Sequence, residues 1–178
     1  TEEYLRLITI TANYPHKNLR IIKKVLPILI ERNLKVCFTL SIPADDFKNT
    51  FGEESAYLKN LGPVSSKDCP KHYNDSDALF LPTLLECFTA SYPEAMIMER
   101  PILTSGLPFA RQICGEGNAL FFDPLNAVDI ADKIEKLVKD EKLYDDLVQR
   151  GLSRVKDFCS SEERANSYIS ILEEIHGN

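Results

Sequence analysis

Two glutamates, Glu86 and Glu94, are separated by seven residues in a loop that leads into a predicted helix. The backbone N–H groups at a helix start lack intrahelical partners and bind anions. Thr89 and Ser91 lie between the glutamates and add hydroxyl groups. Carboxylates accept hydrogen bonds from sugar hydroxyls, whereas amides donate to phosphate oxygens. The pattern therefore indicates a ligand that carries both hydroxyl groups and phosphate.

A second interpretation of these residues needs no ligand. A glutamate near a helix N-terminus is favoured by the helix macrodipole alone. Glu86 can equally be a solvated loop residue. The spacing of the two glutamates leaves both interpretations open.

Alternating strands and helices must position this loop. Strands are predicted at residues 5–11, 34–42, 60–64, 78–82, 101–105 and 118–122. Helices are predicted at residues 19–32 with Asn18 as N-cap, and at 45–51, 53–58, 66–74, 93–99 and 108–114. Three amphipathic helices follow from about residue 128. The alternation predicts an α/β fold with a doubly wound parallel sheet.

We expect a single domain over residues 1–178, with a core of about 4–125 and a helical tail of about 126–178. The tail either packs around the sheet or crosses to another domain. Ligands of such sheets bind beyond the carboxyl ends of the strands. Three loops, at residues 12–18, 82–94 and 105–109, follow strands and should open on this one edge.

Composition excludes several classes of function. The chain has 178 residues and a net charge of −6, which gives no general attraction to nucleic acid or anionic membranes. Its five cysteines show no metal-binding spacing, and this usage predicts a reduced, cytoplasmic protein without zinc. No apolar run of about 20 residues is present to span a bilayer.

Several short motifs together resemble glycosyltransferase family 4. The stretch from Leu81-Pro82-Thr83 through Glu86-Cys87-Phe88-Thr89 to Pro93-Glu94 resembles its E-x7-E region. Tyr14-Pro15-His16-Lys17-Asn18 resembles its lysine loop, and Leu61-Gly62-Pro63-Val64 its G-x-V turn. Leu107-Pro108-Phe109-Ala110-Arg111 and Phe122-Asp123-Pro124 resemble its later loop and strand end. The resemblance implies one Rossmann-like half of a GT-B fold, the donor-binding domain of a retaining glycosyltransferase of polysaccharide or glycoconjugate synthesis.

The resemblance also implies roles for single residues. Lys17 would hold the donor diphosphate and Glu86 the hydroxyls of the transferred sugar, which makes these two the catalytic candidates. Glu94 would bind the ribose hydroxyls of the nucleotide.

The other substrate-binding candidates are neighbours of these three residues. Phe88 and Thr89 would offer backbone amides, and Gly62 and Val64 would line the base. His16 precedes Lys17 and could touch phosphate, although a loop histidine is more often solvated. Cys87 lies inside the motif, and we prefer to interpret it as a small packing residue.

One position departs from the family pattern. Many members carry an arginine five residues before the lysine, where this chain has Ala12. Neither Arg6 nor Arg111 is an evident replacement. The departure leaves open a non-catalytic sugar-nucleotide-binding partner subunit. A nucleotide-sugar epimerase is a further alternative, because that class shares the GT-B fold.

The resemblance implies few further partners. The donor would be GDP- or UDP-linked, and an acceptor domain would precede this chain in the same protein. No metal site and no other cofactor are expected, because no D-x-D pair lies at a strand end. Contact with the inner face of the membrane would have to come through the absent domain.

Overall fold

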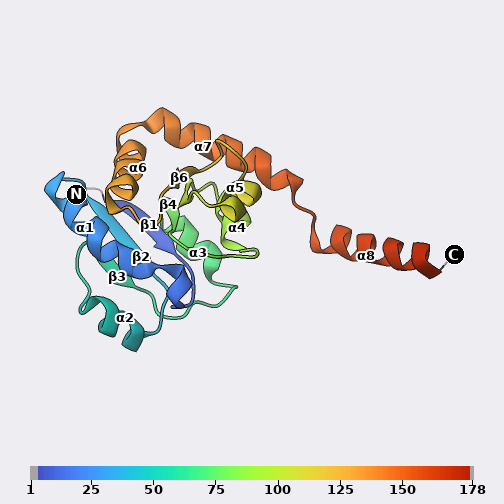
Figure 1. Ribbon diagram of the computed structural model, residues 1–178, viewed down its shortest axis with the longest axis horizontal. Helices are drawn as coiled ribbons and strands as arrows, with labels where there is room; N and C mark the ends of the chain where they lie inside the picture. Colours follow the sequence, from blue (N-terminus) through green and yellow to red (C-terminus); the bar gives the residue numbers. More distant parts are fainter. Residues whose placement is uncertain (1–3, 177–178) are drawn as a thin grey trace.

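Six short strands form one parallel sheet in the computed structural model, which describes residues 4–176 (Figure 1). The strands are β1 (Leu5–Thr9), β2 (Val36–Leu40), β3 (Leu58–Asn60), β4 (Ala78–Leu81), β5 (Ile102–Ser105) and β6 (Leu120–Phe122). Their order across the sheet is β3-β2-β1-β4-β5-β6, and every neighbouring pair is parallel. The predicted doubly wound, Rossmann-like sheet is confirmed.

Helices cover both faces of this sheet, so its central strands are mostly apolar. Leu7 and Phe80 face α1 (Ile22–Glu31), α2 (Ala44–Phe51) and α6 (Ala127–Lys139). Ile8 and Leu79 face α3 (Cys69–Asn74), α4 (Ser91–Ile97) and α5 (Pro108–Cys114). All four residues of β4 are buried, as expected for a strand with a helical layer on each side.

The order of the strands reverses between β1 and β4. Chain connections run outward from this point in both directions, which leaves a crevice where the loops after the two strands diverge. The loop after β1 contains the short 3-10 helices η1 (Pro15–Lys17) and η2 (Leu19–Ile21), and the loop after β4 leads into α4. Both loops lie at the carboxyl edge of the sheet, as predicted.

The segment before β3 differs from the prediction. Residues 53–58 were predicted to be helical, but they form a turn, with a bridge between Ser55 and Leu58. Leu58 pairs with Phe38 of β2, whose amide also donates to the carbonyl of Tyr57. Strand pairing therefore overrides local helix propensity, and β3 begins two residues earlier than predicted.

The C-terminal helices divide into packed and unpacked parts. α6 packs against α1 through buried residues such as Ile130 and Ile134. α7 (Glu141–Arg154) lies against α4, with Gly151 directly over Met96. A last 3-10 helix, η3 (Val155–Asp157), leads to α8 (Ser161–His176), which extends away from the rest of the molecule (Figure 1).

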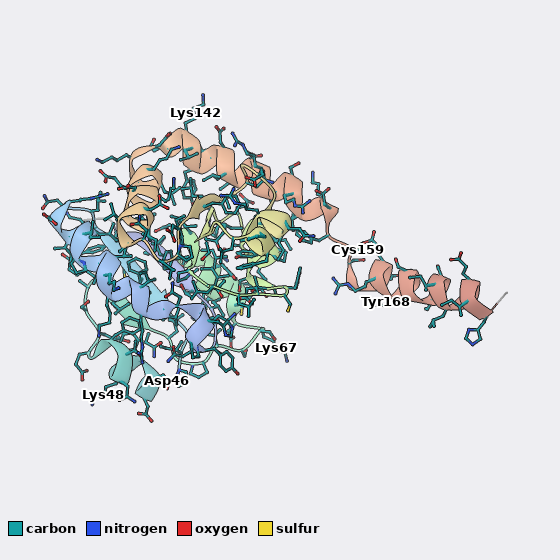
Figure 2. The ribbon with its side chains drawn as sticks, viewed as in Figure 1. Asp46, Lys48, Lys67, Lys142, Cys159 and Tyr168 are labelled. Atoms are coloured by element: carbon teal, nitrogen blue, oxygen red, sulfur yellow. The ribbon has the colours of Figure 1, made fainter. Side chains whose placement is uncertain are left out.

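Every residue from 162 to 176 is exposed, including Tyr168 of α8 (Figure 2). Among residues 4–176, no helix combines the length and apolar character needed to cross a membrane. The ends of the predicted domain, residues 1–3 and 177–178, lie outside the described range.

Candidate functional site

Hydrogen bonds join the loop after β1 to the loop after β4. The carbonyl oxygen of His16 accepts a bond of 2.7 Å from the Leu84 amide and one of 3.2 Å from the Thr83 hydroxyl. Thr83 is fully buried, and its side chain is fixed by these contacts. The two loops therefore form one unit over the point where the strand order reverses.

Asn18 adds a third loop to this unit. Its backbone adopts the left-handed conformation, with φ of 55°. Its side-chain amide donates to the carbonyl oxygens of Pro82 at 3.2 Å and Pro124 at 2.8 Å. Asn18 lies at the N-cap position of η2, directly before the predicted helical segment, but its side chain makes no capping bond, and α1 begins only at Ile22. Asparagine tolerates the left-handed region, and its amide here satisfies two carbonyls beyond the sheet edge.

The central contact of the site is an ion pair between Lys17 and Glu86. The Lys17 ammonium group binds Oε1 of Glu86, so the two catalytic candidates meet although they are 69 residues apart. Only 14% of the Lys17 side chain and 9% of the Glu86 side chain are exposed. Glu86 is therefore not the solvated loop residue of the ligand-free interpretation.

Glu94 is held differently, by a buried phenol. It lies in the first turn of α4, as predicted, and its Oε2 accepts a hydrogen bond of 3.1 Å from the Tyr73 hydroxyl. Burial, together with the neighbouring Glu94 carboxylate, raises the pKa of Tyr73 far above its ordinary value. The phenol therefore stays protonated and acts as a donor.

The residues directly after Glu86 are open to solvent, whereas Ser91 and Tyr92 at the start of α4 are buried. Phe88 is 53% exposed and contacts the ring of Phe158 edge-on at 6.5 Å between centroids. The Thr89 hydroxyl accepts a bond of 3.3 Å from the Ser91 amide and so caps the start of α4. Cys87 is exposed, so our preferred interpretation of it as a packing residue was wrong.

Gly62 and Val64 form a separate end of the same edge, because they follow β3, two strands away from β1. Gly62 has φ of +71°, a conformation that favours glycine, and it borders a hollow of about 410 Å³. Val64 packs under α3 and α4. The Cys69 thiol of α3 contacts the Ser65 carbonyl at 3.5 Å, so α3 links this turn to Tyr73 and Glu94.

His16 contributes its main chain to the site. Its ring is half-buried and stacks on Tyr14, with 5.7 Å between centroids and 11° between planes. The loop bonds described above use its carbonyl oxygen. Contact of the ring with a phosphate stays a prediction.

The two arginines that we judged unsuitable for the diphosphate are both engaged elsewhere. Arg6 binds Asp77 at 2.6 Å, and Asp77 precedes β4, at the opposite edge of the sheet. Arg111 binds Glu116 at 2.8 Å and lies over the Phe121 ring.

Sequence reasoning missed two residues of the site. Arg20 is exposed and borders a hollow of about 350 Å³ together with Asn13 and Tyr14 of the lysine loop. Tyr73 lies 21 residues before Glu94 on another helix. No periodicity or spacing signals the Tyr73 contact, whereas Arg20 could have been found by its distance of three residues from Lys17.

This arrangement can bind a ligand with two kinds of groups. Lys17 supplies a point charge for phosphate, and the two carboxylates supply acceptors for hydroxyl groups. Within the described residues, no three His, Cys, Asp or Glu side chains gather as metal ligands would.

Comparison with known sequences places the chain in a family. Residues 2–154 match the family described as Glycosyl transferases group 1. The chain belongs to this family.

A curated relative and two solved structures extend this finding. The capsular polysaccharide biosynthesis glycosyltransferase CapM of Staphylococcus aureus is 32% identical over 136 residues, which cover 70% of this chain and 36% of CapM. A glycosyltransferase from Rickettsia africae ESF-5 matches 100% of this chain and 49% of its own, with a TM-score of 0.82 and 14% identity. Sucrose-phosphate synthase from Thermosynechococcus elongatus matches 98% of this chain and 46% of its own, with a TM-score of 0.80 and 14% identity.

The structural matches show the fold alone, and they confirm the predicted resemblance to GT-B glycosyltransferase domains. This group 1 glycosyl transferase chain spans about a third of CapM and about half of the two solved chains.

Proposed function

We propose that this chain binds a GDP- or UDP-linked sugar and takes part in transferring that sugar, with retained anomeric configuration, to an acceptor hydroxyl. The observation that carries the proposal is the Lys17–Glu86 ion pair where the strand order reverses. An ion pair with little exposure, at the edge where ligands of such sheets bind, offers one partner for phosphate and one for hydroxyl groups.

The donor provides a new binding partner for each of the two residues in this ion pair. Its diphosphate takes the Lys17 ammonium group, and its sugar hydroxyls donate to the Glu86 carboxylate. Lys17 then neutralises the negative charge that develops on the departing diphosphate. We assign neither carboxylate as a nucleophile, so the contribution of these residues is positioning and charge stabilisation.

We assign the remaining candidate residues to different parts of the donor. Glu94 binds the ribose hydroxyls, and Gly62 and Val64 line the base. Backbone amides of Phe88 and Thr89 contact sugar or phosphate. Phe88 and Cys87 are exposed beside Glu86, which supports their assignment to the sugar end.

We also propose that an acceptor-binding domain precedes these residues in a longer protein. The chain spans 36% of CapM, which supports this arrangement. The exposed apolar residues of α8, among them Ile169 and Leu172, are available to pack against such a domain. Since CapM is a capsular polysaccharide biosynthesis glycosyltransferase, a role in polysaccharide synthesis is the natural extension.

Titration calorimetry with UDP, GDP and their sugars tests the donor assignment. We expect weak, millimolar-range binding by the 178-residue chain and tighter binding and turnover by the longer protein. Sugar released from the donor must appear on an acceptor with unchanged anomeric configuration. A folded longer protein that binds none of these nucleotides would exclude the proposal.

One observation favours a non-catalytic binding subunit instead. Ala12 stands where many family members carry an arginine, so the cation pair that those members place on the diphosphate is incomplete here. Replacing Glu86 by Gln in the longer protein separates the two functions, because an unchanged transfer rate would indicate a non-catalytic site. A nucleotide-sugar epimerase is recognised by product formation without any acceptor.

A further inference from the structure

Tyr73, a residue of α3, makes hydrogen bonds to residues at both ends of α4. Its hydroxyl reaches the first turn, at Oε2 of Glu94. Its carbonyl oxygen accepts a bond of 2.9 Å from the side chain of Arg100, which follows α4. The Tyr73 side chain is almost fully buried, so its orientation is fixed by packing as well as by these bonds.

The two oxygens of the Glu94 carboxylate have different surroundings. Oε2 is occupied by the Tyr73 hydroxyl at 3.1 Å. Oε1 receives no hydrogen bond from any residue in the range 4–176. The Ser91 carbonyl is a second possible acceptor for the phenol, but it lies at 3.4 Å. The Glu94 carboxylate is the better partner because it is charged and closer.

We infer that Tyr73 is a positioning residue that locks Glu94 and thereby sets selectivity for ribose over deoxygenated nucleotides. By holding Oε2, the phenol aims Oε1 at the ligand and reduces the rotamer freedom that Glu94 would lose on binding. A carboxylate oriented in this way gains more from a ribose hydroxyl than a mobile one. The inference rests on the proposed function, since it requires Glu94 to contact ribose.

The protonation state of Tyr73 agrees with this role. Burial and the Glu94 charge raise the pKa of Tyr73 far above neutral pH. The phenol therefore stays protonated and remains a hydrogen-bond donor to Glu94 at neutral pH.

The simpler alternative is that Tyr73 is only a core residue whose hydroxyl needs a partner. The two alternatives differ in one measurable quantity, the ratio of the Kd for a 2′,3′-dideoxynucleoside diphosphate to the Kd for the ribonucleoside diphosphate. A partly unfolded variant weakens both ligands by the same factor, so this ratio stays meaningful even when stability falls.

The test uses ligand-observed NMR on the 178-residue chain, with UDP, GDP and their 2′,3′-dideoxy counterparts as probes. For the unmodified chain we expect a ratio of about ten, the value of one hydrogen bond to a charged group. Tyr73→Phe should lower the ratio to about three, and Glu94→Ala should lower it to about one, which means no discrimination between the two nucleotides. The double variant should behave like Glu94→Ala, because Tyr73 acts only through Glu94.

A matched control loses an equivalent phenol bond elsewhere. Tyr144 of α7 donates to the Asp77 carbonyl at 2.9 Å, at the opposite edge of the sheet. Tyr144→Phe should leave the ratio unchanged, even if it lowers the Tm as much as Tyr73→Phe does.

The outcomes distinguish a failure of the role inferred for Tyr73 from a failure of the proposed function. If Tyr73→Phe keeps the full ratio while Glu94→Ala loses it, the inference is wrong and the proposed function stands. If Glu94→Ala keeps the ratio, the ribose role proposed for Glu94 is wrong, and the inference fails with it. No saturable binding up to about 10 mM would overturn the proposed donor site in this chain.

Discussion

The two glutamates of the site are held in opposite ways. Glu86 comes from a loop and is paired with a full positive charge from a second loop, through Lys17. Glu94 comes from a helix and accepts a hydrogen bond from a neutral phenol, Tyr73, which is buried between helices. Both carboxylates are partnered, but only one of the two partners is itself expected to bind the ligand.

This difference separates a part of the site that must rearrange from a part that is already arranged. A ligand that binds both Lys17 and Glu86 has to break an ion pair that has little exposure to solvent. A ligand that reaches Glu94 finds Oε2 occupied and Oε1 available. We therefore expect the sugar–diphosphate end to change partners on binding and the nucleoside end to stay as it is.

The largest effect should follow from Lys17→Ala. Glu86, with 9% of its side chain exposed, would be left as an almost buried carboxylate without a cation. We expect the free energy of unfolding to fall by about 3 kcal/mol, measured by urea denaturation. The kcat of the longer protein should fall by about 100-fold, because the charge on the leaving diphosphate is no longer neutralised.

The control for Lys17→Ala is the double variant Lys17→Met/Glu86→Gln, which removes both charges. Stability should recover by more than half, since a neutral pair carries no uncompensated charge, while activity should stay low. Lys17→Ala with unchanged stability would show that the ion pair is a loose surface contact, and the contrast between the two glutamates would disappear.

Replacing each glutamate in turn by glutamine should affect different quantities, the transfer rate for Glu86 and the nucleotide affinity for Glu94. Glu86→Gln removes the charge that competes for Lys17, so the Kd for UDP or GDP without a sugar should stay equal or improve. The transfer rate should nevertheless fall by about 100-fold, because the sugar loses its acceptor. Glu94→Gln should instead raise the Kd for the same nucleotides by about tenfold.

Calorimetry with the nucleotide alone and steady-state kinetics with the full donor distinguish these effects. Both variants are isosteric, so each serves as the control for the other. Equal losses of nucleotide affinity in the two variants would contradict the division into two ends.

The sheet could be predicted because its signals are local and redundant. The buried segments around Leu7, Phe38 and Phe80 are nearly continuous in apolar character, which is typical of parallel strands covered on both faces. Once the strands are parallel, the loops after β1 and β4 must share an edge, so the shared edge could be predicted. The ion pair between Lys17 and Glu86 depends in addition on the adjacency of β1 and β4, which the sequence pattern did not specify.

The contacts that fix the site depend on tertiary packing and could not be predicted in this way. Asn18 reads as a helix cap from its neighbours alone, yet its amide binds the carbonyls of Pro82 and Pro124 across two loops. The phenol of Tyr73 selects Glu94 because α3 happens to pack on α4. Residues 53–58 follow their partner strand, which local propensity cannot anticipate.

Asn18→Ala should give an intermediate effect, confined to the Glu86 end. The buried carbonyls of Pro82 and Pro124 lose their donor, and alanine is strained at a φ of 55°. We expect a loss of about 2–3 kcal/mol in the free energy of unfolding. Asn18→Gly removes the amide without the strain and should recover about 1 kcal/mol of that loss.

The ratio of the dideoxynucleotide Kd to the ribonucleotide Kd provides the specific readout for Asn18, because Asn18 lies beside Lys17 and the ratio reports on Glu94. Both Asn18 variants should leave it unchanged. A changed ratio would mean that the two ends of the site are mechanically coupled.

The smallest effect concerns two thiols, one at each end of the site. Cys87 is exposed beside Glu86, whereas Cys69 is buried near Glu94. Burial, and then the Glu94 charge, raise the pKa of Cys69, so it holds less thiolate at pH 8 and should react with Ellman's reagent slowly. Raising the pH should speed the labelling of Cys69, because a raised pKa moves thiolate formation to more alkaline pH.

Ligand should protect Cys87 in proportion to occupancy. With UDP-sugar or GDP-sugar at twice its Kd, about two thirds of the sites are filled, and labelling should slow to about one third of the free rate. Cys159, exposed in the connector to α8, is the matched control and should label at an unchanged rate (Figure 2). Equal protection of Cys87 and Cys159 would indicate a general change of the protein. If a bound donor protects neither Cys87 nor Cys159, Cys87 does not contact the donor. The sugar contact would then be assigned to Glu86 without Cys87.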